Sequence, residues 1–349
     1  MVVSELTAVS LFSGVGGFDL AMQRNGIKTV ATVEIDKHAR GVLERRFPNA
    51  KHFTDVTKVT GDELKAAGFI PERGIITGGF PCQDLSVAGK RAGLAGERSG
   101  LYWEIIRLVD ELSPAYLVLE NVPGLLSSNG GRDMGAVIGA LSTRGYGVSW
   151  RVLDAQYFGV AQRRRRVFIV GCAGDTRGTS AEILALGEGM RGYIKTSRKK
   201  GQEFTTGTGE SIAPSLLTMR EGSPGGGKGP LISKNISLTL ATGNGQVLIN
   251  HGFVKSKRAR SDKDNESWIE GAVVPTLNAF DMGDTRATVI ALTSIVRRLT
   301  PIECERLQGF PDNWTEGQSD SARYRQMGNA VAVPVVEWIM ERLVANDRI

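Results

Sequence analysis

The sequence contains few cysteines and no long apolar segment. Its 349 residues include Cys82, Cys172 and Cys304, which are too few and too far apart for a disulfide framework or a zinc site. No apolar run is long enough to span a bilayer, and the N-terminus lacks the basic-then-apolar layout of a signal peptide. We therefore expect no metal ion, no membrane segment and a cytoplasmic protein in a reducing compartment.

The excess of positive charge is moderate, at +6, but basic residues gather at 163–166 and at 255–260. Basic clusters are typical of proteins that bind a polyanion, although solvated surfaces also carry them. Charge alone leaves both interpretations open. Alternation along the arginine run, beside the strand that follows it, predicts that Arg164 and Arg166 point inward and Arg163 and Arg165 outward.

The first half of the chain alternates strand patterns with amphipathic helix patterns. Strands are predicted at 9–12, 28–33, 75–77, 116–119, 147–153 and 167–171, and helices at 18–24, 37–47, 101–112 and 134–141. Strands alternating with helices predict an α/β fold with a doubly wound sheet.

The composition changes after Cys172. Gly, Thr, Ser and Lys are frequent from 173 to about 296, and three loosely similar hairpin-like units lie at 212–232, 236–249 and 274–290. These units predict an irregular, mostly β domain. Helical patterns return where Thr300 and Glu303 have capping-box spacing, and a last helix is predicted at 335–344.

Two features near the N-terminus indicate a nucleotide-like ligand. A glycine-rich turn at 13–17 follows the first predicted strand, and such a turn lets the backbone approach a ligand closely. Glu34 ends the second strand, where a carboxylate can accept both hydroxyl groups of a ribose. Together they predict an adenosine-containing cofactor. Asp55, in a polar loop, is either a turn former or a contact to an adenine amino group.

Reactive side chains also follow two later strands. Cys82 comes directly after Pro81 at the end of one, and Glu120 ends another. Ligands of open α/β sheets bind at the carboxyl ends of the strands, so Glu34, Cys82 and Glu120 are expected to share one crevice. Taken alone, Cys82 is either a nucleophile or a small buried hydrophobic residue.

The motifs of this chain resemble those of the DNA cytosine-5 methyltransferases, in the family's order and over nearly the whole length. They are FSGVGG at 12–17, Glu34, Asp55, GFPCQ at 79–83, ENV at 120–122, QRRRR at 162–166, the segment 298–311 and QMGNAV at 326–331. The resemblance implies a Rossmann-like sheet that uses S-adenosylmethionine (AdoMet), with a smaller, mostly β target-recognition domain. It assigns 1–172 to the catalytic domain, completed by 322–349, and 173–321 to target recognition and its return segment.

The resemblance also implies roles for individual residues. Cys82 would attack C6 of a cytosine flipped out of double-stranded DNA, so that C5 takes the methyl group of AdoMet. Glu120 would bind N3 and the exocyclic amine, Arg164 the carbonyl oxygen, and Arg166 would hold Glu120. The cofactor residues implied are Phe12, Gly14, Gly16, Gly17, Glu34, Asp55, Pro81 and Asn329. The DNA-binding residues implied are Gln83, Ser86, Gln162, Thr239 and Thr276.

Three other interpretations are an inactive DNA-binding protein, a nicotinamide oxidoreductase and an RNA cytosine methyltransferase. The intact set of Cys82, Glu120 and Arg164 argues against the first, the incomplete dinucleotide spacing of the glycines against the second, and the large insert against the third. We expect a monomeric, sequence-specific enzyme associated with the nucleoid. It would act beside a separate restriction endonuclease, or as a solitary or phage anti-restriction enzyme.

Overall fold

The computed structural model describes residues 5–81, 100–175, 178–186 and 299–347, and the backbone of six short strands between 215 and 298. Five residues with predicted roles lie outside the described residues: Cys82, Gln83, Ser86, Thr239 and Thr276. Their roles therefore stay predictions from the sequence.

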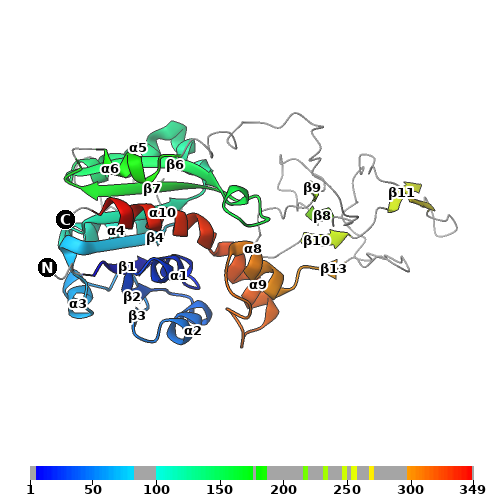
Figure 1. Cartoon of the computed structure of the whole chain (residues 1–349), viewed down its shortest axis with the longest axis horizontal. Coiled ribbons are helices and arrows are strands. Elements are labelled where there is room, and N and C mark those ends of the chain that lie inside the picture. The colour runs from blue at the N-terminus through cyan, green and yellow to red at the C-terminus, as the bar shows by residue number, and fades with distance from the viewer. Residues whose placement is uncertain are drawn as a thin grey trace.

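A seven-stranded sheet forms the centre of the larger part of the molecule, in the order β3-β2-β1-β4-β5-β7-β6 (Figure 1). Its strands are β1 (Thr7–Leu11), β2 (Lys28–Val33), β3 (Lys51–Phe53), β4 (Gly74–Gly79), β5 (Tyr116–Asn121), β6 (Tyr146–Asp154) and β7 (Arg165–Ala173). Pairing is parallel from β3 through β5, whereas β7 is antiparallel to both of its neighbours.

The reversal of β7 follows from the short connection that precedes it. Between β6 and β7 the chain forms one 3₁₀ turn, Ala155–Tyr157, and no α-helix. A parallel connection needs a crossover of about a dozen residues or more, usually helical, so the two strands pair as a hairpin instead. The strand predicted at 167–171 is therefore present, and the short connection makes it antiparallel to both neighbours. As a result, the amino end of β7 lies at the same sheet edge as the carboxyl ends of β4 and β5.

Helices cover both faces of the sheet, which confirms the doubly wound α/β arrangement. The first face packs against α1 (Gly17–Arg24), α2 (Lys37–Arg46), α6 (Thr179–Ile183) and α10 (Val333–Asn346). The second packs against α3 (Gly61–Ala66), α4 (Leu101–Leu112) and α5 (Arg132–Ser142). None of the helices in the described part of the chain is long and apolar enough to cross a membrane.

Strand β5 shows why its sequence is continuously apolar. Tyr116 and Val118 pack on the first face, and Leu117 and Leu119 on the second. Full burial of a Leu or Val side chain contributes roughly 1.5–3 kcal/mol. A strand that is buried on both faces therefore gains stabilisation from each of its apolar residues. The apolar run of β5 ends at Glu120, its first polar residue.

The return segment 299–321 packs with the sheet domain. It contains α8 (Pro301–Gln308), which begins with the predicted capping box of Thr300 and Glu303, and it leads to α9 (Asp320–Asn329). Trp314 lies in the same core as Val15 and donates its indole N–H to the Val15 carbonyl at 2.8 Å. This packing argues for a return to the sheet domain near residue 299 rather than at the predicted 322.

The packing of α6 bears on the other domain boundary, which was predicted at residue 172. Helix α6 lies after residue 172, yet Ile183, Leu184 and Leu186 are in the core that contains α10. Arg342 of α10 donates to the carbonyl of Ile183 at 2.8 Å. These contacts argue for a first boundary near residue 186.

The intervening part forms two small antiparallel sheets, with orders β13-β10-β8-β9 and β11-β12. The strands are β8 (Ser215–Thr218), β9 (Leu231–Lys234), β10 (Gln246–Ile249), β11 (Phe253–Lys257), β12 (Ser267–Glu270) and β13 (Arg297–Arg298). The first predicted hairpin unit is confirmed by the pairing of β8 with β9. Strand β10 pairs with β8 and β13, and the third unit lies outside the described residues.

Asp19 of α1 is a fully buried carboxyl group on the first face of the sheet. Among the described residues, neither of its oxygens has a hydrogen bond of good geometry, although the hydroxyls of Ser10 and Thr29 partly offset the effect of burial. Burial raises the pKa of Asp19 from 3.8 to about 7. The folded protein therefore holds a proton that the unfolded chain releases at much lower pH.

We expect Asp19→Asn to remove a pH dependence of stability. Because the pKa is raised on folding, the wild type is stabilised below pH ~4, and this contribution is lost as pH rises through about 7. A shift of this size corresponds to on the order of 4 kcal/mol. The free energy of unfolding, measured with denaturant from pH 4 to 8, should rise for the variant relative to the wild type as pH rises. A constant difference between the two proteins across this range would contradict the assignment.

Candidate active site

Three strand ends meet at one edge of the sheet. Strand β4 continues through Phe80 and Pro81 toward Cys82, β5 ends at Glu120 and Asn121, and β7 begins at Arg165. The register pairs Gly79 with Glu120 on one side, and Glu120 with Phe168 on the other. The carboxylate of Glu120 therefore lies between the strand that leads to Cys82 and the strand that carries the arginine run.

Glu120 forms an ion pair with Arg166. The guanidinium Nε of Arg166 lies 2.9 Å from Oε1 of Glu120, and both side chains are largely buried, at 16% and 14% exposed. Burial raises the pKa of Glu120, while Arg166 and Arg164 oppose that rise. The net shift is upward, so the protonated form of this carboxyl is favoured more than in a solvent-exposed glutamate.

A glycine next to Glu120 provides room for its carboxylate. A Cβ on Gly79 would lie 3.0 Å from Oε2 of Glu120, closer than most real contacts of this kind. Any larger residue would displace the carboxylate or the strand. The carboxylate of Glu120 in β5 therefore explains why β4 has a glycine at position 79.

The alternation predicted for the arginine run is confirmed. Arg164 is buried, Arg166 is partly buried, and Arg163 and Arg165 are exposed. The register explains this, because Leu153 pairs with Arg166 and Asp154 with Arg165 where β7 begins.

Arg164 connects the site to the C-terminal segment. Its Nη2 donates to the carbonyls of Gly328 at 3.2 Å and Ala330 at 2.7 Å, on either side of Asn329. Its Nε and Nη1 are buried, with no hydrogen-bond partner among the described residues. Burial lowers the pKa of Arg164 to about 9, so the side chain remains a cation at neutral pH. The charge of the Glu120 carboxylate opposes this lowering of the pKa of Arg164. The two unpartnered donor atoms of Arg164 therefore belong to a cation.

Gln162 also has unused hydrogen-bonding capacity. Its side chain has no exposed surface, and neither amide atom has a partner among the described residues. Leaving a buried polar group unsatisfied costs about 1–3 kcal/mol. The position is therefore one at which a further partner is expected.

The glycine-rich turn is in contact with Glu34. Phe12 has a φ of 54°, which is left-handed for a non-glycine residue and is typical of functional sites. The N–H of Gly14 donates to Oε2 of Glu34 at 2.7 Å, and the N–H of Asp36 donates to Oε1 at 2.8 Å. These bonds orient the carboxylate over the turn, and each oxygen keeps a lone pair for another donor.

Two glycines of the turn are required by close packing. Gly16 has a φ of 87°, and a Cβ there would lie 2.5 Å from the ring of Phe47. A Cβ on Gly17 would lie 2.7 Å from Val331, which follows Asn329 and Ala330. The turn is therefore directly against the α9–α10 junction. Asn329 itself is exposed at the end of α9.

The remaining predicted cofactor residues differ in what the structure shows of them. Asp55 accepts from the N–H of Thr57 at 3.0 Å and from its hydroxyl at 2.7 Å, so it acts as a turn former. The hydrogen bonds from Thr57 lower the pKa of Asp55, which leaves an anionic acceptor at the surface. Pro81 is exposed at the end of the described part of β4.

Ile35 is a residue that the sequence did not single out. It directly follows Glu34 and is 78% exposed, the largest value among the exposed large hydrophobic residues that the structure describes. Ile35 therefore exposes an apolar surface next to Glu34, the predicted acceptor of the ribose hydroxyls. A flat aromatic ring could pack on this surface. The signal was present as an isoleucine between two acidic residues, Glu34 and Asp36.

The two described cysteines are not candidates for the nucleophile. Burial raises the pKa of both Cys172 and Cys304 to about 12, so neither forms a thiolate near neutral pH. Within the described ranges, no group of three or more His, Cys, Asp or Glu side chains could hold a metal ion.

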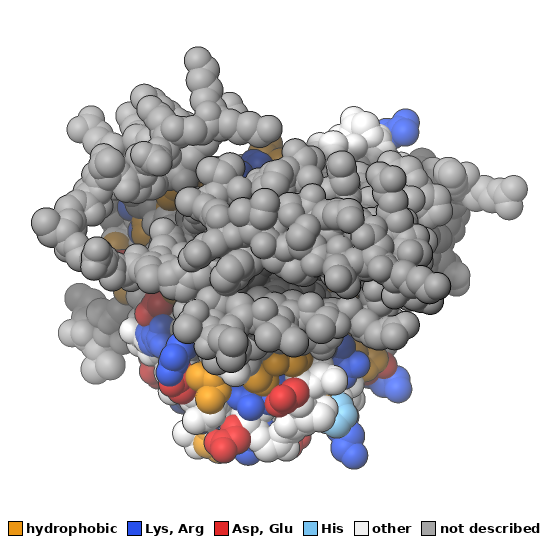
Figure 2. Space-filling view, turned by 90° about the vertical axis from the view of Figure 1, so that its right-hand side faces the viewer, with side chains coloured by type: hydrophobic (Ala, Val, Ile, Leu, Met, Phe, Trp, Pro, Cys, Tyr) orange, Lys and Arg blue, Asp and Glu red, His pale blue; other side chains and the backbone are white. Residues whose placement is uncertain are grey.

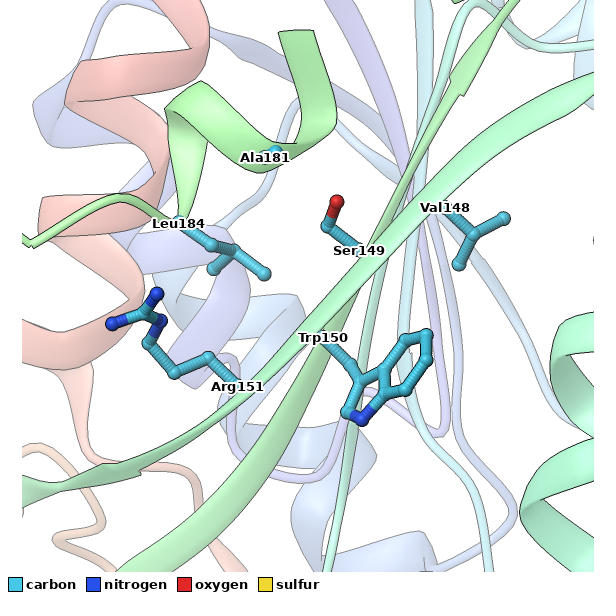
Figure 3. Close-up of a pocket in the computed structure, with 6 residues that line it drawn as sticks. All are labelled: Val148, Ser149, Trp150, Arg151, Ala181 and Leu184. Atoms are coloured by element: carbon cyan, nitrogen blue, oxygen red, sulfur yellow. The ribbon is translucent and has the colours of Figure 1, made fainter. Parts of the chain in front are cut away.

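A hollow of about 250 Å³ lies away from this site, at the outer edge of the sheet (Figure 3). It is lined by Val148, Ser149, Trp150, Arg151, Ala181 and Leu184. In the figure, Trp150 and Arg151 project from opposite faces of β6, with Leu184 on the Arg151 side. The hollow contains none of the predicted site residues.

Comparisons with known proteins cover nearly the whole chain. The family described as C-5 cytosine-specific DNA methylase matches residues 6–345. The type II methyltransferase M.Sau3AI of Staphylococcus aureus is 31% identical, over 99% of this chain and 97% of that protein. A protein of Escherichia phage P1 named DNA N-6-adenine-methyltransferase is 29% identical, over 98% of this chain and 61% of its own length.

A solved structure agrees with these similarities. The crystal structure of a DNA modification methyltransferase encoded within an Escherichia coli prophage has a TM-score of 0.56 and 25% identity. The match covers 98% of this chain and 99% of that one. With the Glu120–Arg166 pair at the strand edge and a family match from residue 6 to residue 345, this chain belongs to the C-5 cytosine-specific DNA methylases.

Proposed function

We propose that this protein transfers a methyl group from AdoMet to C5 of a cytosine in double-stranded DNA, with Cys82 as the nucleophile. The observation that carries the proposal is the largely buried Glu120–Arg166 pair, one strand away from the backbone that leads into Pro81 and Cys82. Activation of a pyrimidine ring requires a nucleophile and an acid. Cys82 is the predicted nucleophile, and the carboxyl of Glu120, whose pKa is raised, is suited to be the acid.

The residues of the turn are chemically suited to AdoMet. The oriented Glu34 carboxylate can accept the ribose hydroxyls, and the exposed Ile35 side chain can pack on the adenine. No atom of the described residues lies within 4 Å of where a Cβ on Gly14 would be, so these residues leave space beside this carboxylate. Asp55 offers an anionic acceptor for the adenine amine, and Asn329 lies where α9 ends near the turn. When bound, AdoMet supplies an electrophilic methyl group.

The chemistry of cytosine assigns the other roles. C5 is a weak nucleophile, and addition of the Cys82 thiolate at C6 turns the ring into an enamine whose C5 is nucleophilic. Negative charge then develops toward N3. A protonated Glu120 can donate its proton there, and burial favours this form by raising the pKa of the carboxyl. After the transfer, loss of the C5 proton to solvent, release of the thiolate from C6 and return of the N3 proton to Glu120 restore the aromatic ring and the acid.

The two inward arginines have different tasks. Arg166 holds Glu120 in place by the ion pair. Arg164 stays cationic and has two donor atoms without a partner among the described residues, so it can bind the carbonyl oxygen of the cytosine at C2. Its bonds to the carbonyls of Gly328 and Ala330 would couple this contact to the segment that borders the cofactor turn.

The target base must leave the duplex to reach these groups, at a cost of about a few kcal/mol. The described side chains on the face in Figure 2 include both basic and acidic groups, so no single-sign surface there identifies the DNA path. We assign base recognition to residues 187–298, with Thr239 and Thr276 as the predicted contacts. Gln83, Ser86 and Gln162 are the predicted contacts around the flipped base.

The similarity to a type II methyltransferase favours a role in restriction–modification, beside a separate endonuclease. We propose that the protein is a monomer and that it associates with the nucleoid through DNA. The test is transfer of labelled methyl from AdoMet to duplex DNA, followed by digestion to nucleosides, with tRNA as a competing substrate. Label in 5-methylcytosine of DNA is expected. Label in N6-methyladenine, or in tRNA alone, would reject the proposal.

Glu34→Ala should weaken AdoMet binding selectively. The variant loses the acceptor for the ribose hydroxyls, and hydrogen bonds to a charged group contribute about 1.5–3 kcal/mol each. Because two hydroxyl groups lose their acceptor, we expect the Kd for AdoMet, measured by calorimetry, to rise by at least about 100-fold. Glu44→Ala on α2 is the control, since this residue is exposed and has no predicted cofactor role. Equal dissociation constants for the wild type and Glu34→Ala would remove the ribose role.

A further inference from the structure

Tyr102 is a fully buried residue in the first turn of α4. Its ring centroid lies 5.0 Å from that of Phe80, with the rings tilted by 49°. Phe80 is 3% exposed and stands two residues before Cys82 in the sequence. The contact therefore joins the start of α4 to the end of the strand that leads to the proposed nucleophile.

Both partners of this contact are anchored to other elements. The Tyr102 hydroxyl donates to the carbonyl of Val137 in α5 at 2.9 Å, and the contact is buried. Burial raises the pKa of this hydroxyl, so it remains a donor throughout the working pH range. On the other side, the amide of Asn121 donates to the carbonyl of Phe80 at 2.8 Å.

We infer that Tyr102 is a positioning residue for the nucleophile: its ring holds Phe80, and with it the backbone that places Cys82. The inference rests on the proposed function, because it assumes that Cys82 reacts. The Phe80 carbonyl is held from β5 and its ring from α4, so the strand end is fixed from two directions. A displacement of about 1 Å at a reacting atom can cost roughly 100-fold in rate.

A purely structural role for Tyr102 would give a different result. Loss of a buried aromatic ring destabilises any core, but it leaves the rate of the folded enzyme unchanged unless the ring positions a reacting group. Tyr146 provides the matched control. It is also buried, and its hydroxyl donates to the carbonyl of Pro114 at 2.7 Å, but it begins β6 at the opposite sheet edge.

The experiment compares Tyr102→Leu, Tyr102→Phe and Tyr146→Leu with the wild type. The single-turnover rate of methyl transfer is measured at saturating AdoMet and DNA, together with the Kd for AdoMet and the Tm. We expect Tyr102→Leu to lower the rate about 10- to 100-fold while the Kd stays within about twofold. Tyr102→Phe keeps the ring and should retain most of the rate. Tyr146→Leu should lower the Tm but not the rate.

A folded Tyr102→Leu with the wild-type rate, or an equal rate loss in Tyr146→Leu, would overturn the inference. Should Tyr102→Leu fail to fold, Phe80→Leu tests the same contact from the other side and must show the same selective rate loss. A wild type that transfers no methyl group to DNA would reject the proposed function instead. The two failures are therefore distinguishable.

Discussion

Replacing Cys82 with alanine should abolish methyl transfer and leave AdoMet binding unchanged. Without the sulfur no covalent bond forms at C6, so C5 is never activated, and we expect the rate to fall by at least about 10³-fold. The proposed cofactor contacts lie in the turn at 12–17 and at Glu34, not on this side chain. Transfer is measured with labelled AdoMet, and the Kd by calorimetry.

The two described cysteines are the controls for this experiment. Cys172 and Cys304 are buried and have pKa values raised to about 12, so Cys172→Ala and Cys304→Ala should keep activity once they fold. Full activity of Cys82→Ala would refute the nucleophile. Loss of activity in all three variants would point to damaged folding rather than chemistry.

Glu120→Ala should lower the transfer rate by about 10²–10⁴-fold, the usual contribution of a positioned acid. The variant removes the donor to N3 and also leaves Arg166 without its ion pair. Glu120→Gln is the sharper test, because it keeps the shape of the side chain but cannot give up a proton. Single-turnover rates at saturating substrate isolate the chemical step.

The pH dependence gives a second readout for Glu120. Burial raises its pKa, so the fraction of protonated carboxyl falls as pH rises through that value, and the wild-type rate should decline on the alkaline side. Glu120→Gln should lack this decline.

Glu305→Gln is the matched control, since Glu305 is a buried carboxylate paired with Arg323 at 3.0 Å and has no predicted contact with the base or the cofactor. It should lose stability but keep its pH profile. An unchanged rate and pH profile in Glu120→Gln would eliminate the acid role.

The sequence predicted the elements of the sheet domain well, because each has a strong local signal. Helix 101–112 is observed with the predicted bounds, and the strand predicted at 28–33 is β2. The strand predicted at 116–119 continues to Asn121, since the last two residues are polar and carry no hydrophobic signal. Short elements such as β3 and α3 went unpredicted, since a few residues carry little periodicity.

The domain boundaries were harder to predict. A change of composition marks residue 173, but α6 still packs against the sheet domain, and so does the return segment from residue 299. Packing between distant segments leaves no local pattern, so a compositional change can only approximate such a boundary.

The candidate site divides in the same way. The motifs and their spacing predicted the side chains of the site, including Glu34, Glu120 and Arg164. Only the tertiary structure decided how they meet. Strand β7 is reversed because its connection is too short for a crossover, and this brings Arg164 and Arg166 to the sheet edge at which β5 presents Glu120. Likewise, Tyr102 meets Phe80 because two layers pack, which no local sequence signal records.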